Sequence, residues 1–239
     1  MKTLLLEIGT EEIPAGYIAP ALKALSSRLL QKMTDAHIGH GATRTFGTPR
    51  RLAVTVENVA DRQRSLTDEI IGPPAGIGFD ENGQPTLAAK KFAEKTGSSL
   101  KALKIKKTDR GLYLSVKKTE KGSATRTVLQ TILPEVILST PFPKTMRWGC
   151  ISVSFARPIH SILALLGGQI VPFVLGGIKS NRCVYGHSFM HPSRIKVSHP
   201  DTYVQQLRKA FVLVDGKERR ERVEDEIETA AKGLGGKVL

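Results

Sequence analysis

Apolar and polar residues repeat with two different periods near the start of the chain. Leu4, Leu5 and Leu6 run into Glu7, which ends the apolar run before it could form a signal-peptide core, so this stretch predicts a buried first strand. A helix is predicted over residues 17–36, because its apolar residues recur at spacings of four and three: Ile18, Leu22, Leu25, Leu29 and Met33. This helix should cover a sheet.

Strict alternation predicts a second strand further on. Apolar and other positions alternate through Leu52, Ala53, Val54, Thr55, Val56 and Glu57. One face of this strand should be buried, and the other should be open to water or covered by a partner.

Between residues 61 and 122 the pattern changes, and we interpret this segment as an insertion or subdomain. Glycine and proline interrupt it, and lysine is frequent. A short helix is predicted over residues 86–96, with Gly97 as its end. A lysine-rich hairpin is predicted to turn at Asp109-Arg110-Gly111.

The next predicted helix begins at Ser123, which is a good N-terminal cap, and it contains Pro134, which predicts a kink or a break. Its buried face should consist of Val128, Leu129, Ile132, Val136 and Ile137.

Residues 162–178 are uncharged and mostly apolar, which is also typical of a membrane span. Gly167, Gly168 and Pro172 divide them into two runs of strand length, however, and the whole is short for a bilayer. The segment therefore predicts a buried hairpin.

Four further elements are predicted after this hairpin: a strand over 195–198, a helix over 201–210, a strand over 211–214 and a helix over 217–232. The last helix carries six acids and five bases around an apolar line of Val223, Ile227 and Ala231, and Gly233 is its predicted end. So narrow an apolar stripe does not fold by itself.

Helices and strands alternate irregularly, which favours an α+β fold with a mixed sheet and covering helices. We expect one α+β domain over residues 1–200, with the insertion at about 61–122. Residues 201–239 would form a helix-strand-helix segment that leads into a further part of a longer protein.

The composition allows a sizeable core and indicates an anionic partner. The chain has 239 residues, 40% of them hydrophobic, with a formal net charge of +14 and a pI of about 9.9. A folded basic protein with few aromatic residues more often binds nucleic acid than an acidic small molecule. A basic surface that only keeps the protein soluble is the alternative. The two cysteines, Cys150 and Cys183, imply no disulfide scaffold and favour a reducing cytoplasm.

Negative side chains are absent from one long stretch. Residues 136–200 contain no Asp or Glu, whereas seven cations fall there and supply half of the net charge: Lys144, Arg147, Arg157, Lys179, Arg182, Arg194 and Lys196. The guanidinium groups of Arg147 and Arg157 can each bind a phosphate through two hydrogen bonds. The stretch as a whole therefore favours anion binding.

Aromatic residues and histidines accompany these cations. Trp148, Phe155, His160 and His187 could stack on or border an unpaired base. In the alternative interpretation, Trp148 and Phe155 belong to the core and the arginines lie at its rim.

Three carboxylates lie close together in the sequence. Glu7, Glu11 and Glu12 could form an acid and base, because crowding raises the pKa of one of them. Carboxylates in a turn before a helix more often take part in ion pairs, for which Arg50 and Arg51 are the candidates. We favour the ion-pair interpretation.

Other motifs are incomplete. His37-Ile38-Gly39-His40 spells an ATP-holding signature of one class of aminoacyl-tRNA synthetases, but it follows a helix instead of beginning one. Gly186-His187-Ser188-Phe189-Met190 is near a nucleophile elbow but has Met190 in place of the second glycine.

Cysteine and histidine residues at regular spacing are also candidate zinc ligands. Cys183, His187 and His191 are spaced by four and could be completed by Cys150, but Gly186 and Pro192 argue against the helix that would align them. No metal site and no catalytic residue is therefore expected in this chain.

Five stretches, in this order along nearly the whole chain, resemble the β subunit of the bacterial tetrameric glycyl-tRNA synthetase. They are LEIGTEEIP at 6–14, FGTPRRLA at 46–53, PKTMRWG at 143–149, FARPIH at 155–160 and GH at 186–187. The family usually continues Gly-His-Arg-Phe, and here Ser188 stands in place of the arginine.

The resemblance implies an α2β2 enzyme whose α subunit activates glycine with ATP and Mg, while the β subunit binds glycine tRNA and contacts α. This chain would be the N-terminal portion of β, noncatalytic and without a cofactor of its own, in a cytoplasmic enzyme. Its fold is expected to be similar to the editing-module region of the phenylalanyl-tRNA synthetase β subunit. The final helix would lead toward an HD-like domain.

The residues expected to contact tRNA or the α subunit are Arg50, Arg51, Lys144, Arg147, Trp148, Arg157, His160, Arg182 and His187. Three alternatives stay open. The chain could be an editing-type deacylase that uses His160 or His187 as a base. It could also be an RNA-binding module without a synthetase role, or a scaffold whose basic stretch docks on α.

Overall fold

The computed structural model describes residues 1–80, 83–109, 111–149 and 152–238, and the chain divides into two compact units. The first unit comprises Met1–Gln63 and Ser123–Leu239, and the second comprises Arg64–Gly122. Over these described ranges, no helix is both long and apolar enough to cross a membrane.

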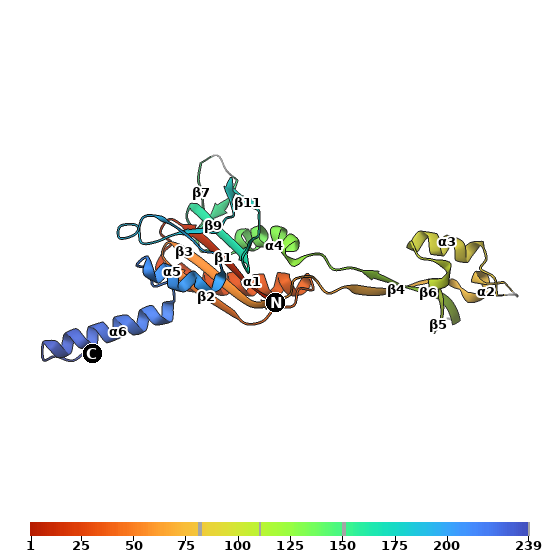
Figure 1. Cartoon of the computed structure of the whole chain (residues 1–239), viewed down its shortest axis with the longest axis horizontal. Helices are drawn as coiled ribbons and strands as arrows, with labels where there is room; N and C mark the ends of the chain where they lie inside the picture. Colours follow the sequence, from red (N-terminus) through yellow and green to blue (C-terminus); the bar gives the residue numbers. More distant parts are fainter. Residues whose placement is uncertain (81–82, 110, 150–151, 239) are drawn as a thin grey trace. The chain divides into compact units, whose positions relative to one another are not determined.

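One five-stranded sheet organises the first unit. Its strands are β1 (Lys2–Thr10), β2 (Thr43–Thr48), β3 (Arg51–Val59), β9 (Ile159–Leu166) and β10 (Gln169–Ile170), in the order β10-β9-β1-β3-β2 (Figure 1). The predicted first strand and the strand that follows Arg50 are both confirmed. β1 lies at the centre and pairs with β3 and β9.

Neighbouring strands of this sheet all pair antiparallel, so the prediction of a mixed sheet is wrong. The reason is the position of β3. β1 and β2 are joined through a helix and run in the same direction, which is the connection that parallel neighbours need. Because β3 lies between them and pairs with both, no parallel ladder forms.

Two helices cover one face of the sheet. α1 (Ala15–Asp35) packs on β2 and β3 and against α4 (Thr125–Ser139). The predicted apolar face of α1 is confirmed, since Leu25, Leu29 and Met33 are fully buried. The strands contribute alternate residues to the same core: Leu4, Leu6, Ile8, Leu52, Val54, Val56, Ile162, Ala164 and Leu166.

The start of α4 differs from its prediction. Its N-terminal cap is Ala124, without a side-chain hydrogen bond, so the prediction of Ser123 as the cap is wrong. The Ser123 N–H donates instead to the side-chain oxygen of Gln63 (3.0 Å), and its carbonyl accepts from the Gln63 N–H (3.0 Å). These two bonds hold Ser123 in the connection that precedes the helix.

Pro134 lies inside α4, and the break predicted there does not occur. A proline removes one helical hydrogen bond. The predicted buried face is confirmed, with Leu129, Ile132, Val136 and Ile137 buried and Val128 packed against the same core. This packing on both sides of Pro134 offsets the missing bond.

The chain itself covers the other face of the sheet. A hairpin of β13 (Cys183–Tyr185) and β14 (Arg194–Lys196) lies there, and η2 (Pro200–Thr202) leads into α5 (Tyr203–Lys209). The second core joins Leu5, Ala53 and Leu163 of the sheet to Val184, Val197, Tyr203 and Leu207 of this layer. The expectation that one face of β3 is open to water or meets a partner is therefore wrong.

Short hairpins complete the first unit. β9 and β10 form the buried hairpin that residues 162–178 predict, with Gly167 at its turn in the left-handed region (φ 56°). β11 (Val174–Leu175) pairs with β12 (Ile178–Lys179), and β7 (Met146–Arg147) pairs with β8 (Ser154–Phe155).

The strand predicted over residues 211–214 is wrong. Phe211 has a left-handed backbone (φ 62°), and the Val212 N–H bonds back to the Leu207 carbonyl of α5 (2.9 Å). Within the described chain, the segment is tied to β2 by one backbone bond, from the Gly47 N–H to the Val214 carbonyl (3.2 Å). One bond does not make a ladder.

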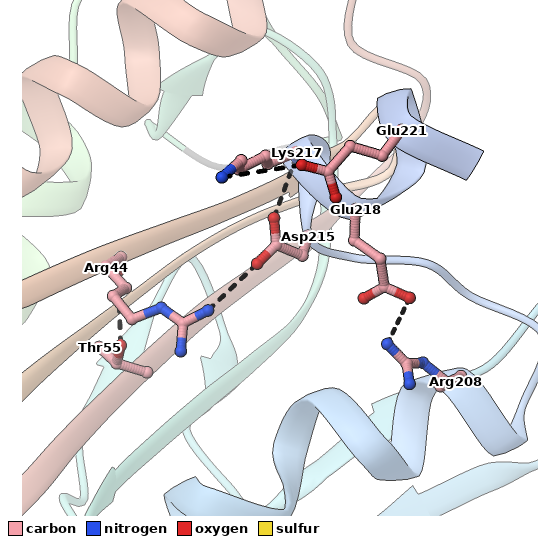
Figure 2. A network of polar contacts seen from close by, with 7 residues as sticks. All are labelled: Arg44, Thr55, Arg208, Asp215, Lys217, Glu218 and Glu221. Atoms are coloured by element: carbon pink, nitrogen blue, oxygen red, sulfur yellow. Dashed lines mark hydrogen bonds and ion pairs between the residues drawn. The ribbon is translucent and has the colours of Figure 1, made fainter. Parts of the chain in front are cut away.

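Polar contacts join the first turn of α6 (Gly216–Gly233) to the rest of the first unit. Asp215 caps the helix by accepting from the Lys217 N–H (3.0 Å) and pairs with Arg44 of β2 (3.1 Å), as Figure 2 shows. Glu218 pairs with Arg208 of α5. These charged contacts fix the start of α6 directly after Val214, which is buried in the second core.

The rest of α6 is exposed. The structure describes every residue of this helix, and none of them is buried; Val223 and Ile227 of the predicted apolar line are about half exposed. The helix is confirmed, but it includes Gly233 and its C-terminal cap is Leu234.

The second unit contains a three-stranded antiparallel sheet in the order β4-β6-β5. The strands are β4 (Leu66–Pro74), β5 (Lys104–Thr108) and β6 (Gly111–Glu120), and the helices are α2 (Ala75–Gly78), α3 (Leu87–Thr96) and η1 (Leu100–Ala102). The predicted end of α3 is confirmed, because Gly97 is left-handed (φ 64°). Pairing of β5 with β6 confirms the lysine-rich hairpin, while Arg110 of its turn lies outside the described residues.

We predict that Leu25→Ala destabilises the first unit by about 2–5 kcal/mol, because it leaves a cavity where a fully buried side chain stood. Ile227→Ala, on the exposed side of α6, should change stability by less than about 0.5 kcal/mol. Denaturant unfolding followed by the fluorescence of Trp148, the only tryptophan, reports on this unit. Equal destabilisation by the two substitutions would contradict this packing.

Candidate functional site

A polar cavity opens over the second face of the sheet. Arg51 of β3, Gly9 of β1 and Ser161 of β9 are paired across three neighbouring strands. Paired residues point to the same face of an antiparallel sheet, so Arg51 and Ser161 flank a position without a side chain. A Cβ on Gly9 would lie 2.3 Å from the hydroxyl oxygen of Ser161. The glycine thus leaves room for a cavity of about 480 Å³.

A buried ion pair of Glu7 and Arg51 lines this cavity, and Tyr203 bonds to this pair from outside the lining. The carboxylate of Glu7 accepts hydrogen bonds from the Tyr203 hydroxyl and from Arg51 Nη1 (3.4 Å), while Arg51 Nη2 donates to the Tyr185 carbonyl (2.8 Å). Burial, and then the negative charge of Glu7, raise the pKa of Tyr203 well above its ordinary value of 10.0. The hydroxyl therefore stays protonated and donates a hydrogen bond to Glu7.

Two buried polar atoms of the cavity-lining residues have no hydrogen-bond partner in the described part of the chain. They are the hydroxyl oxygen of Thr10 and Nε of Arg51, and the two residues are 4% and 6% exposed. A buried polar group without a partner costs about 1–3 kcal/mol. Arg51 Nε can only donate. A small molecule that satisfied both groups would present oxygen or nitrogen acceptors.

Ion pairs line the rim. His160 Nε2 lies 3.0 Å from Glu11 Oε1, and Arg50 Nε lies 3.2 Å from Glu12 Oε1. With Glu7 and Arg51 below them, each of the three carboxylates has one basic partner. The ion-pair interpretation is therefore confirmed for Glu7 and Glu12, whereas Glu11 contacts a histidine, which is charged only when protonated.

The loop after β13 forms one wall. A Cβ on Gly186 would lie 2.7 Å from a backbone carbonyl oxygen of the same loop, so the position requires glycine. His187 Nδ1 accepts the backbone N–H groups of residues 189 and 190, both at 3.2 Å. The Gly-His motif thus shapes the loop that places Ser188 at the cavity.

The structure brings only part of the predicted site together. Arg50, Arg51 and His160 line the cavity, and His187 shapes the loop beside it. The remaining predicted residues do not line the cavity: Lys144, Arg147, Trp148, Arg157 and Arg182.

Two groups of cations occupy opposite faces of the sheet. Arg147 lies on β7, Lys179 lies on β12, and Lys144 lies shortly before β7. Apolar residues close to them in the sequence pack on the α1 side: Phe142, Trp148, Phe173 and Ile178. Arg182, Arg194 and Lys196 belong to the β13–β14 layer, whose Val184 and Val197 pack on the α5 side. The acid-free stretch does not form one continuous surface.

Neutral groups, not carboxylates, accept hydrogen bonds from three of the four arginines of this stretch. Arg157 donates to the Ala156 carbonyl (2.9 Å), Arg182 to the Gly168 carbonyl (3.2 Å) and Arg194 to the Tyr185 hydroxyl (2.8 Å). None of the seven cations is in an ion pair among the residues that the structure describes. Their positive charge is therefore uncompensated within the described chain.

The aromatic residues divide between core and surface. Phe155 is 1% exposed and packs edge-on against Phe142 with ring centroids 4.7 Å apart, so the suggestion that it stacks on a base is wrong. Trp148 is partly buried against the same core and keeps part of its surface exposed.

Sequence reasoning missed Thr10 and Ser161, which line the cavity, and Tyr203, which bonds to Glu7 from outside the lining. The first two have common hydroxyl side chains that carry no local signal. Only the pairing of β1 with β9 places Ser161 opposite Gly9.

The sulfur and imidazole groups considered for zinc do not assemble within the described residues. Cys183 is a free thiol, and no group of three potential metal ligands occurs in the described ranges. Cys150 lies outside these ranges.

Comparison with known proteins identifies the family. Residues 4–239 match the family model described as glycyl-tRNA synthetase beta subunit. The glycine–tRNA ligase beta subunit of Desulfatibacillum aliphaticivorans is 47% identical over 239 residues, which are 100% of this chain and 35% of that protein. Those of Desulforapulum autotrophicum and Myxococcus xanthus are 48% and 42% identical, over 97% and 100% of this chain and 34% of each protein.

These relatives define the class as a subunit of an aminoacyl-tRNA synthetase. The chain belongs to the glycyl-tRNA synthetase β-subunit family, and it spans about one third of the length of the curated relatives that it matches.

We predict that Tyr203→Phe costs about 1–3 kcal/mol near neutral pH, because Glu7 loses a buried donor. Folding holds the pKa of Tyr203 above its unfolded value of 10.0, so its contribution is complete below pH 10 and is lost as the pH rises further. The difference in unfolding free energy between the unaltered chain and the variant should therefore shrink above pH 10. Unfolding at several pH values from 7 to 11 measures it, and a constant difference would contradict this assignment.

Proposed function

We propose that this chain is a tRNA-binding, α-subunit-contacting part of glycine–tRNA ligase. In the proposed α2β2 enzyme of the cytoplasm, it supports the ATP-dependent attachment of glycine to its tRNA, while catalysis lies on the α subunit. Family membership supports the synthetase role. The uncompensated cations of residues 136–200 are the observation that carries the RNA-binding role.

The physical argument concerns charge and pre-organisation. A guanidinium that bonds to a carbonyl or hydroxyl keeps its full charge and part of its donor set, whereas a carboxylate partner would neutralise it. The hydrogen bond from Arg194 to Tyr185 also raises the pKa of Arg194, so this side chain stays charged. Fixed and unneutralised guanidinium groups favour phosphate, which they bind through paired hydrogen bonds.

Two separate cation groups suit two partners. One group (Lys144, Arg147 and Lys179) lies on the α1 side of the sheet, and the other (Arg182, Arg194 and Lys196) lies on the α5 side. RNA and the α subunit could therefore be bound at the same time. ATP and Mg²⁺ would belong to the α subunit, and the proposal assigns neither of them to this chain.

Charge removal should separate these roles. We predict that Lys144→Ala/Arg147→Ala or Arg194→Ala/Lys196→Ala weakens binding of a glycine tRNA transcript and flattens its salt dependence, by about 0.7–0.9 in slope for each phosphate that is no longer bound. Fluorescence anisotropy at several salt concentrations measures the slope. Arg222→Ala is the matched control, because Arg222 already pairs with Glu226 on α6 (2.8 Å) and should leave the slope unchanged.

A scaffold role is the outcome that would contradict RNA binding. If both double variants kept the tRNA slope of the unaltered chain but no longer co-purified with the α subunit, the basic groups would serve α alone.

The cavity favours a second candidate function, an editing-type deacylase. The first unit would then be similar to the editing-module region of the phenylalanyl-tRNA synthetase β subunit. His160 and Ser161 are adjacent on the cavity wall, and Glu11 orients the imidazole. In this alternative, water attacks the ester carbonyl, His160 takes its proton, and the ester bond to the ribose oxygen breaks with return of a proton to that oxygen.

This candidate predicts hydrolysis of mischarged glycine tRNA by the chain, slowed at least about tenfold by His160→Ala, as loss of a general base requires. His199→Ala is the control, because His199 forms a comparable exposed pair with Asp201 (3.0 Å) away from the cavity. Release of the radiolabelled amino acid measures the rate. Hydrolysis no faster than in buffer would remove the deacylase candidate and leave the binding role standing.

A further inference from the structure

The second unit carries an excess of lysine. Residues 64–122 contain ten lysines and two arginines against seven acids. Two ion pairs involve these lysines within the described residues, Lys106 with Glu69 and Lys118 with Glu120. Most of the lysines of this unit therefore keep an unneutralised charge.

Strand register sorts the residues of the sheet into two faces. Lys104 pairs with Ser115, Lys106 pairs with Tyr113, and Glu69 pairs with Lys117. Because paired residues and residues two apart share a face, these six side chains all lie on one side of the sheet. Lysines from two strands thus flank the single half-buried tyrosine Tyr113.

The helices of the unit cover the opposite face. Leu114 and Val116 of β6 are buried, and a Cβ on Gly78 of α2 would lie 2.5 Å from Leu114. Phe92 of α3 similarly contacts the position of Gly72 in β4. The apolar side of β6 therefore packs against α2 and α3, which leaves the lysine side without a covering layer from this unit.

Side-chain exposure agrees with an open face. Lys104, Lys106 and Lys117 are exposed, and Ser115 between them is small and buried at the sheet surface. Glu69 is the carboxylate of this face, and it accepts from both Lys106 and Ser115. Lys104 and Lys117 have no ion-pair partner among the described residues.

We propose that this face, defined by Lys104, Lys106, Tyr113 and Lys117, is an RNA-binding surface that takes the phosphate backbone of tRNA, with Tyr113 beside a ribose or base. The inference rests on the proposed tRNA-binding function and adds a second site to it. Lysine is depleted at protein–protein interfaces, whereas lysine with an interleaved aromatic residue is typical of nucleic-acid surfaces. The face therefore favours RNA over an acidic protein.

Charge reversal on the two faces of this unit tests the proposal. In Lys104→Glu/Lys117→Glu, the whole 239-residue chain should bind a glycine tRNA transcript at least about tenfold more weakly at about 0.1 M salt, and its salt slope should fall by about 1.4–1.8. The matched control is Lys91→Glu/Lys95→Glu, which makes the same charge change on exposed positions of α3. The control should bind within about threefold of the unaltered chain.

Three outcomes would overturn the proposal. Equal weakening by both double variants would mean that only net charge matters, and unchanged binding by Lys104→Glu/Lys117→Glu would mean that the face does not touch RNA. Failure to co-purify with the α subunit, together with unchanged tRNA binding, would make it a protein-binding face. Lys104→Gln/Lys117→Gln tests whether misfolding causes the weaker tRNA binding, because it removes both charges without adding repulsion. It should keep the circular-dichroism spectrum of the unaltered chain and bind tRNA with an affinity between those of the unaltered chain and Lys104→Glu/Lys117→Glu.

These experiments test RNA binding by the second unit separately from RNA binding by the first unit. If the variants at 144/147 and 194/196 bind tRNA normally while Lys104→Glu/Lys117→Glu does not, the second unit is the RNA site and the first-unit assignment fails. The converse result removes the second-unit site and leaves the first-unit assignment intact.

Discussion

The first unit depends on one buried charged cluster, the carboxylate of Glu7 with its donors Arg51 and Tyr203. Removing two opposite charges from water costs several kcal/mol for each ion unless hydrogen bonds satisfy them. Here the bonds come from three elements, because Glu7 lies on β1, Arg51 on β3 and Tyr203 at the start of α5. A fourth, β13, contributes the Tyr185 carbonyl. The cluster therefore fixes both the sheet and the layer that covers its second face.

Features of the fold that depend on residues close together in the sequence could be predicted, and features that depend on distant residues could not. The α1 helix, the glycine that ends α3 and the β5–β6 and β9–β10 hairpins follow from periodicity and turn residues, and these were predictable. Ion pairing of the early carboxylates with Arg50 and Arg51 was suggested by their position in a turn before a helix, which did not indicate that Glu7 is buried. The row of Arg51, Gly9 and Ser161 was not predictable, because strand register brings together residues that are far apart in sequence. The expectation of an open face on β3 was wrong for the same reason, because residues far along the chain cover this face.

Covering both faces of the sheet has an electrostatic consequence. Cations cannot be buried cheaply without partners, so those of residues 136–200 lie on the hairpins and loops outside the two cores. Their neighbours Phe155 and Trp148 anchor these segments by apolar packing, which leaves the charged side chains in solvent. The lack of acids in residues 136–200 is thus a property of the loops and hairpins that carry the cations. These loops and hairpins lie on two different faces of the sheet.

Charge and shape are carried by different parts of the molecule. At the cavity, Glu7 and Glu12 neutralise Arg51 and Arg50, so long-range attraction contributes little there. Its unpartnered Thr10 and Arg51 groups instead reward a molecule whose acceptors fit them, which is a source of selectivity. The exposed lysines and arginines supply attraction that any polyanion would feel. Binding to this chain should therefore combine a salt-dependent, unselective contribution from the surface with a salt-independent, selective one from the cavity.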